Sequence, residues 1–259
     1  LGNGDLLIQN NTKGAKIKVD EIETVLESSK IYPLLRGRDV KRWFSKPSGH
    51  ILITHEETDG LKAIDENRMI VAYPKTYKYL KYFENFIRNR SGYKRYFSSK
   101  APFYSIYNIG KYTFSPYKVV WPEQSSSFTA AVLGPENNKT VIPDHKLMMV
   151  DIYNKNEAYY LCGLLNSTPV RFVIESYAIS IQQDTHILNN VAIPKFDENI
   201  ELHNLISEVA CQAHDHSRDS NFEGLAEDEI KLDKLACALW NISEHDLVEL
   251  VASIRLLKE

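Results

Sequence analysis

The spacing of apolar residues predicts a mixed first part and a helical last part of this chain. Short apolar runs with several β-branched residues predict buried strands at 50–54, 69–73, 118–122, 128–133 and 145–152. Towards the end, Leu202, Leu205, Ile206 and Val209 recur at helical spacing. We therefore expect an α+β fold: an irregular mixed sheet with packed helices over residues 1–196, then a C-terminal helical segment over 197–259.

Further helices are predicted at 20–29, 74–90, 156–165 and on to about residue 177, with a tyrosine-rich loop or hairpin at 93–116. The helix that begins at Pro74 is amphipathic. Its apolar side carries Tyr77, Leu80, Phe83 and Ile87, and its basic side carries Lys75, Lys78, Lys81 and Arg88. We expect the apolar side to pack on the core, while the basic side is either a DNA-binding face or a solvated surface.

Charged residues are distributed unevenly, although the formal net charge is only −3. From Arg68 to Lys118 the chain has eleven Lys/Arg, one Asp/Glu and ten of its fifteen tyrosines. Residues 196–259 have instead fifteen Asp/Glu and five Lys/Arg. Cations neutralise phosphates and release counterions, and tyrosine rings offer stacking area. The basic segment therefore predicts a nucleic-acid surface, and the acidic tail predicts helices that pack on this domain or on a separate one.

The composition is typical of a soluble globular protein, with 43% hydrophobic and 25% charged residues. No apolar run approaches the eighteen residues that a membrane span needs, so we expect no membrane partner. The three cysteines lie far apart in apolar contexts, which predicts buried free thiols and a reducing cytoplasm. Because the chain begins at Leu1 rather than Met, we expect it to be a piece of a longer protein.

Only weak catalytic and metal-binding patterns occur in the chain. The His-Asp-His motif at 214–216 lacks the i, i+4 spacing of common zinc sites, which favours a solvated polar turn. Asp144 lies far in sequence from the nearest Glu-X-Lys, at Glu229, which disfavours a metal-dependent nuclease. The Ser-Pro-Tyr motif at 115–117 resembles half of the tetrapeptide with which amino-methyltransferases hold adenine, but the second proline is missing. No glycine-rich turn after a strand is available for S-adenosylmethionine. We expect no catalytic residue, metal ligand or cofactor in this chain by itself.

Six sequence blocks carry a family resemblance. Residues 33–43, PLLRGRDVKRW, resemble the Leu-Arg-Gly-Arg-Asp-Ile-Lys-Arg signature in the C-terminal half of adenine-specific DNA methyltransferases, specifically the TaqI-like and type IIG restriction–modification group. Five more blocks are similar in the same order: 73–80 (YPKTYKYL), 119–123 (VVWPE), 161–167 (LCGLLNS), 191–194 (VAIP) and 230–235 with 239–247. Each block alone is weak, but six in order across nearly the whole chain are specific.

The resemblance implies that the chain is a target recognition domain. Such a domain grips duplex DNA opposite a separate N-terminal methyltransferase domain, which would hold S-adenosylmethionine, in a parent enzyme with or without a fused endonuclease. Arginine forks and side-chain amides can read base edges, whereas the basic stretch would hold phosphates. The predicted DNA-binding residues are Arg36, Arg38, Lys41, Arg42, Lys75, Lys78, Lys81, Arg88, Arg90, Lys94, Arg95, Tyr104, Tyr107, Lys111, Gln182, Gln183, Thr185 and His186.

Three alternatives stay open at the level of the sequence. Arg38 and Asp39 could form a structural ion pair that fixes their loop instead of meeting DNA. The tyrosine-rich basic stretch would equally suit an RNA-binding or single-strand-binding domain of a nucleic-acid-modifying enzyme. The acidic helices would also suit a plain interaction module that docks on a partner domain.

Overall fold

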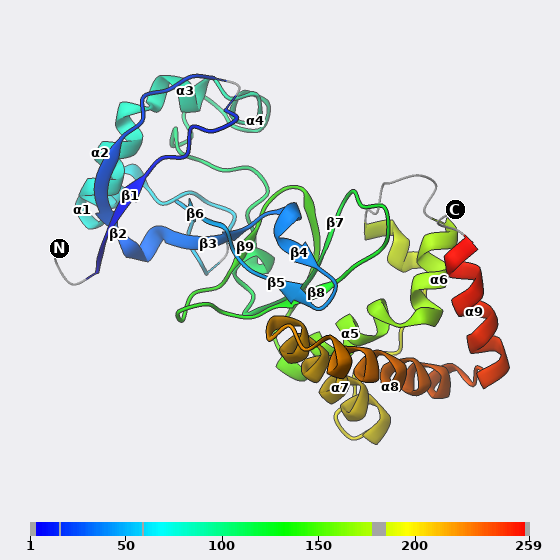
Figure 1. Ribbon diagram of the computed structural model, residues 1–259. Helices are drawn as coiled ribbons and strands as arrows, with labels where there is room; N and C mark the ends of the chain where they lie inside the picture. Colours follow the sequence, from blue (N-terminus) through cyan, green and yellow to red (C-terminus); the bar gives the residue numbers. More distant parts are fainter. Residues whose placement is uncertain (1–3, 16, 59, 178–184, 257–259) are drawn as a thin grey trace. The chain divides into compact units, whose positions relative to one another are not determined.

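The computed structural model describes residues 4–15, 17–58, 60–177 and 185–256, and it combines helices with small mixed sheets (Figure 1). This confirms the expected α+β fold with a helical C-terminal segment. The strands are β1 (Asp5–Gln9), β2 (Glu23–Glu27), β3 (Ile31–Leu35), β4 (Val40–Lys41), β5 (Phe44–Ser45), β6 (Gly49–Leu52), β7 (Tyr117–Pro122), β8 (Ala131–Leu133), β9 (Ile142–Pro143) and β10 (Leu147–Ile152). The helices are α1 (Glu66–Ala72), α2 (Pro74–Tyr82), α3 (Glu84–Arg88), α4 (Ser91–Tyr96), α5 (Lys155–Asn166), α6 (Thr168–Tyr177), α7 (Glu201–Arg218), α8 (Phe222–Trp240) and α9 (Glu244–Leu256).

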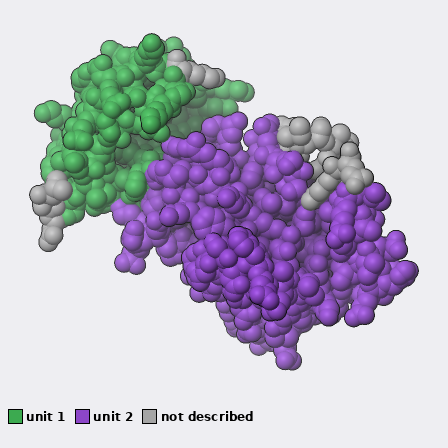
Figure 2. Space-filling view, viewed as in Figure 1, with its two compact units in different colours: residues 1–32, 50–114 green, residues 33–49, 115–259 purple. Residues whose placement is uncertain are grey.

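The chain forms two compact units, coloured separately in Figure 2. Unit 1 comprises residues 1–32 and 50–114, and unit 2 comprises residues 33–49 and 115–259. Unit 1 has fifteen Lys/Arg and eleven Asp/Glu, a net charge of +4, whereas unit 2 has sixteen and twenty-three, a net charge of −7. The charge asymmetry seen along the sequence is therefore also a difference between the units. The two units divide the chain at other places than the boundary predicted between residues 196 and 197. That predicted domain boundary stays a prediction.

Unit 1 is held together by the β1–β2 hairpin and helices α1 to α4. Asp65 caps α1 by accepting the backbone N–H of Asn67 at 3.0 Å, a common way for a helix to begin. Glu27, at the end of β2, accepts the Thr76 hydroxyl at 2.7 Å and the Thr76 backbone N–H at 2.9 Å. These bonds attach α2 to the hairpin. A small core of Ile64, Met69, Phe103 and Tyr104 lies beside α1 and α2.

Unit 2 is built on the antiparallel sheet β10-β7-β8, in which Val120 pairs with Met149 on one side and Ala131 on the other. Helix α5 packs against this sheet, and α7 and α8 lie side by side against α5 (Figure 1). The close helix approach depends on Gly163 of α5, because a Cβ there would lie 3.0 Å from Cβ of Ala210 and 3.3 Å from Leu232. Glycine thus allows α5 to pack closely against both α7 and α8.

Several predicted elements are confirmed, among them the strands at β7 and β10 and the helices α5 to α9. The predicted helix at 74–90 exists as α2 followed by α3, with a break at Phe83. Two predictions were wrong. Residues 69–73, expected as a strand, belong mostly to α1, and residues 20–29, expected as a helix, contain β2. The short apolar run at 69–73 fits either element, and pairing with β1 decided the structure of the second segment.

Candidate nucleic-acid interface

The basic side of α2 is partly neutralised by neighbouring carboxylates in unit 1. Lys75 pairs with Asp5, and Nζ of Lys81 lies 2.7 Å from Glu84. The pairing with Glu84 raises the pKa of Lys81 above its ordinary value, so Lys81 stays charged. Lys78 is exposed, and no described residue forms an ion pair with it. Among the three predicted lysines of α2, Lys78 is therefore the one whose charge is most available to a ligand.

Arg88 and Arg90 serve mainly to hold the fold of unit 1. Nε of Arg88 lies 2.8 Å from Glu84, and its guanidinium lies 5.6 Å from the ring centre of Phe103. Arg90 donates hydrogen bonds to the carbonyl oxygens of Ser105 and Ile87, both at 3.1 Å. A side chain that is already bonded in this way has fewer donors to offer a phosphate. We therefore rank these two arginines below Lys78 as DNA contacts.

A second group of cations lies on and after α4 and is exposed. It consists of Lys94, Arg95 and Lys111, together with Lys100, which follows α4 in the chain. Within the described ranges, none of these four forms an ion pair with a carboxylate. The guanidinium of Arg95 lies 5.3 Å from the ring centre of Tyr96, over its face. This group offers cationic charge together with aromatic surface.

The two tyrosines predicted to contact DNA differ in their surroundings. Tyr104 is buried, and its hydroxyl donates to the carbonyl oxygen of Ile64 at 2.8 Å. It is therefore a core residue of unit 1. Tyr107 is 53% exposed and stacks on Tyr96, with ring centres 3.5 Å apart and planes at 9°. Tyr107 and Tyr96 therefore present aromatic surface to solvent.

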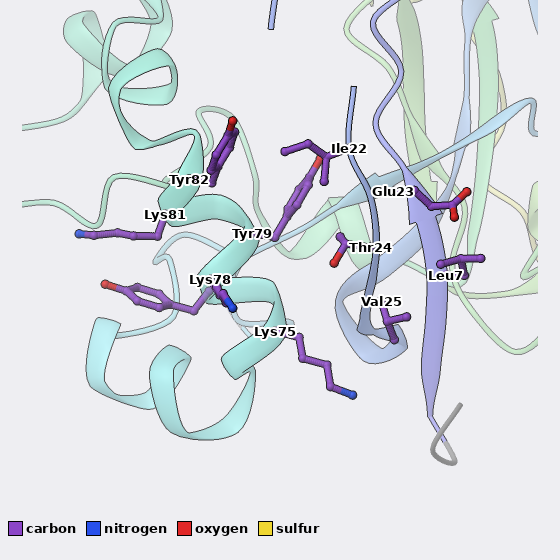
Figure 3. Close-up of a pocket in the computed structure, with 11 residues that line it drawn as sticks. Leu7, Ile22, Glu23, Thr24, Val25, Lys75, Lys78, Tyr79, Lys81 and Tyr82 are labelled. Carbon is purple, nitrogen blue, oxygen red and sulfur yellow. The ribbon is translucent and has the colours of Figure 1, made fainter. Parts of the chain in front are cut away.

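A groove of about 990 Å³ lies between α2 and the β1–β2 hairpin (Figure 3). Its lining is mostly aliphatic and aromatic: Leu7, Ile22 and Val25 line it from the hairpin side, and Tyr79 and Tyr82 from α2. The three lysines of α2 also line it, so the groove joins apolar surface to the basic face. In Figure 3, Tyr79 extends from α2 towards Ile22 and Thr24.

In unit 2 the predicted base-reading loop is a tight 3₁₀ turn, Gly37–Asp39. One carboxylate oxygen of Asp39 accepts the backbone N–H of Arg36 at 2.9 Å and the Ser48 hydroxyl at 2.5 Å. Its other oxygen lies 3.8 Å from Nε of Arg38, whose side chain is 72% exposed. Asp39 thus fixes the loop through Arg36 and Ser48, whereas Arg38 remains largely available to solvent. Of the two residues of the alternative ion pair, Asp39 is the one with a structural role.

Arg38 lines a small polar pocket of about 320 Å³ together with Gln124, Ser125 and Lys146. An arginine fork beside a side-chain amide is the combination that reads guanine and adenine edges in a major groove. Gln124 and Lys146 were not among the residues predicted to bind DNA. Gln124 comes two residues after Pro122 at the end of β7, so the Val-Val-Trp-Pro-Glu block would have been the signal that points to it.

Lys41 and Arg42 are adjacent in sequence but differ in exposure. Lys41 is exposed. Arg42 turns into unit 2, where its Nε lies 3.2 Å from Glu229 and it donates to the carbonyl oxygen of Asn166 at 2.8 Å. Desolvation by burial lowers the pKa of Arg42, although the nearby carboxylates act in the opposite direction. Arg42 is therefore engaged in joining β4 to α5 and α8.

The remaining predicted residues lie at or near the edge of the described structure. Gln182 and Gln183 fall outside the described residues. Thr185 and His186 begin a 3₁₀ helix, Thr185–Asn190, and their side chains are not described.

The His-Asp-His motif at 214–216 belongs to helix α7, so the expected polar turn was wrong. His214 is buried; its Nε2 accepts the backbone N–H of Val132 at 3.0 Å, and its Nδ1 donates to the carbonyl of Ala210 at 2.7 Å. Burial lowers its pKa to about 4. His214 therefore joins α7 to β8 as a neutral ring. No group of three potential metal ligands occurs among the residues that the structure describes.

All three cysteines carry free thiols, as predicted; Cys162 and Cys237 are buried, and Cys211 is half-buried. Desolvation raises the pKa of the Cys162 and Cys237 thiols, which keeps them protonated and unreactive. In the described part of the chain, no helix combines the length and the apolar character needed to cross a membrane.

Comparison with known proteins finds a distant relative that bears on function. No family model matches the chain. The chain is 25% identical over 151 residues to the type II methyltransferase M.NspV of Nostoc sp.. The alignment covers 56% of this chain and 29% of that protein, so the chain spans less than a third of the relative's length. This distant similarity relates the chain to the methyltransferases of restriction–modification systems.

Proposed function

We propose that the chain is a sequence-specific duplex DNA recognition module. Its parent would be an adenine-specific, S-adenosylmethionine-dependent DNA methyltransferase or a fused restriction–modification enzyme of the TaqI-like or type IIG kind. The observation that carries the proposal is the set of exposed cations without a carboxylate partner on α2, on α4 and after α4: Lys78, Lys94, Arg95 and Lys111. The similarity to a type II methyltransferase supports the choice of DNA as the ligand.

The two units suit two kinds of DNA contact. Phosphate contacts position a protein on the duplex, and base contacts specify the sequence. The lysines of α2 and α4 are point charges on helix faces, which suits phosphates. The loop of Arg36 and Arg38, with Gln124 nearby in the pocket lining, offers the fork and amide geometries that match guanine and adenine edges.

A separate domain would supply the chemistry. An enzyme that methylates adenine must take the base out of the stack, so a second domain that clamps the duplex is useful. Gly4, Gly14 and Gly60 are the described glycines with positive φ, and none of them opens a helix directly after a strand. We therefore assign no residue of this chain to S-adenosylmethionine, and we propose that the fragment alone neither methylates nor cleaves DNA.

The test is a binding titration of the chain on duplex DNA at several salt concentrations. If about five cations meet phosphates, the logarithm of the affinity should fall with a slope of roughly −4 to −5 against the logarithm of salt. Lys78→Ala should reduce that slope by about one unit on every sequence. Lys231→Ala, which removes an exposed lysine from the acidic helix α8, is the matched control and should change nothing.

Three results would contradict the proposal. An affinity that does not depend on salt concentration would contradict the phosphate contacts. Tighter binding to RNA or to single-stranded DNA than to duplex would favour the alternative, a single-strand-gripping domain. Methyl transfer by the purified chain in the presence of S-adenosylmethionine would refute the assignment of a binding module without catalysis.

A further inference from the structure

Tyr96 and Tyr107 form a stacked pair on the surface of unit 1. Stacking covers one face of each ring, yet Tyr96 remains 44% exposed and Tyr107 remains 53% exposed. The guanidinium of Arg95 lies over the Tyr96 ring, 5.3 Å from its centre. Aromatic rings with a neighbouring arginine are the arrangement on which unpaired bases stack in nucleic-acid-binding proteins.

The backbone that carries each tyrosine is firmly anchored. Tyr96 ends α4, whose Tyr93 is buried and donates its hydroxyl to the carbonyl oxygen of Ala101 at 2.8 Å. Arg88 in turn donates to the Tyr93 hydroxyl at 2.9 Å. The α4 side of the pair is therefore held by the fold and does not depend on the exposed rings themselves.

Hydrogen bonds hold the residues immediately before and after Tyr107. The backbone N–H of Ile106 donates to Nε2 of His55 at 2.8 Å, and His55 is buried. After Tyr107, Asn108 adopts a left-handed φ of 62°, and the Tyr112 hydroxyl donates to the Asn108 carbonyl at 2.8 Å. The two anchored segments thus fix the positions of the two exposed rings relative to each other. Such preorganisation reduces the entropy that a ligand must offset.

We propose that the Tyr96–Tyr107 stack, with Arg95, is a stacking platform for an unpaired nucleobase. This inference rests on the proposed function, because it assigns to the same DNA-binding surface a subsite for a base that has left the duplex stack. Lys94, in α4, and Lys111, four residues after Tyr107, are exposed cations close in sequence to the two tyrosines, and their charge suits the phosphates that flank such a base. A fully paired duplex would not engage the platform, since its bases are already stacked on one another.

The test compares three DNA ligands: a perfect duplex, the same duplex with one bulged 2-aminopurine, and a single strand of the same composition. With the bulged ligand, the chain should quench 2-aminopurine fluorescence, because stacking on an aromatic ring does so. Tyr107→Leu and Tyr96→Leu should each weaken binding to the bulged ligand and to the single strand about tenfold. Neither should change binding to the perfect duplex or its salt slope.

Two control variants separate ring stacking from hydrogen bonding by the hydroxyl and from a general effect of removing a surface tyrosine. Tyr107→Phe keeps the ring and removes only the hydroxyl, so it should retain both binding and quenching. Tyr153→Leu removes a tyrosine of unit 2 that is 65% exposed, and it should behave as the unchanged protein. Circular dichroism of all variants confirms that any loss is not unfolding.

The possible failures are distinguishable. If the leucine variants lose affinity equally for all three ligands, the tyrosines are general DNA contacts and the platform is contradicted. Unchanged binding in both leucine variants, or a loss in Tyr107→Phe equal to that in Tyr107→Leu, would also overturn it. The unchanged protein could bind only the bulged duplex and the single strand, with this binding lost in the leucine variants. In that case the platform stands and the duplex-recognition proposal fails. If the unchanged protein binds none of the three, both proposals fail.

Discussion

The Arg42 guanidinium forms an ion pair with the carboxylate of Glu229, 3.2 Å away, although the two residues lie 187 positions apart in the chain. The same carboxylate accepts the indole N–H of Trp43 at 2.7 Å. Glu229 thus binds two consecutive residues that follow β4, and it ties them to α8. Arg42, which the sequence analysis predicted to bind DNA, is in the folded chain part of the connection between the sheet and the acidic helices.

Glu229→Ala should destabilise unit 2 by about 2 kcal/mol, because it leaves the desolvated Arg42 without its nearest carboxylate and Trp43 without its acceptor. Both partners are about a quarter exposed, which keeps the expected loss below that of a fully buried pair. Urea unfolding monitored by tryptophan fluorescence measures the change. Glu227→Ala, an exposed residue of the same helix, is the control and should change stability by less than about 0.5 kcal/mol. A loss no larger than that of the control would contradict a structural role for Arg42.

Arg38→Ala should affect sequence discrimination but not stability, whereas Asp39→Ala should lower stability. Arg38 is exposed and its nearest carboxylate oxygen is 3.8 Å away, so its removal should leave stability unchanged. Under the proposed function, the same change in the parent enzyme should relax discrimination at one base pair by about 1–3 kcal/mol. Asp39→Ala removes two acceptor contacts that fix the loop, so it should cost about 1–2 kcal/mol of stability and weaken recognition generally. Sequencing of methylated sites and thermal unfolding measure the two effects. Uniform loss of activity in Arg38→Ala without relaxed specificity would make Arg38 a phosphate contact.

Gly163→Val should destabilise the chain by about 1–3 kcal/mol, because Cβ would press on Ala210, Ile206 and Leu232 from the two neighbouring helices. Gly92→Ala in α4 is the matched comparison, since nothing lies within 4 Å of its added Cβ. That change should stabilise by roughly 0.5–1 kcal/mol through helix propensity. Thermal or urea unfolding of the two variants measures both signs. A neutral Gly163→Val would mean that α5 and α7 can move apart without cost.

Stability should fall as the pH is lowered from about 6.5 to about 4, because of His214. Burial lowers its folded-state pKa from 6.5 to about 4, so in this interval only the unfolded chain binds the proton. Proton uptake by the unfolded state favours unfolding, at about 1.4 kcal/mol per pH unit when fully expressed. His214→Gln keeps an acceptor for the Val132 N–H and does not titrate, so its stability should depend less on pH in this window. Equal pH slopes for the two proteins would show that other groups dominate.

Patterns that the sequence carries locally were predicted well. The repeated apolar spacing of α7 and α8 and the apolar runs of β7 and β10 each indicate their element without help from distant residues. The same holds for the amphipathic start of α2 at Pro74. Residues 69–73 were misassigned because a short apolar run fits a helix or a strand equally well, and residues 20–29 because their strand depends on pairing with β1. Hydrogen bonding with β1 and the cap at Asp65 made the choice.

The sequence by itself determined which residues are charged and aromatic, and hence that cations and tyrosines concentrate at 68–118. Only the tertiary structure decided which of them can reach a ligand. Arg42 met a carboxylate 187 positions away, Tyr104 was buried against Ile64, and Lys78 and Tyr107 were left exposed. Local composition sets the chemistry that a segment offers, whereas burial and ion pairing depend on contacts between residues distant in sequence, which no local pattern encodes.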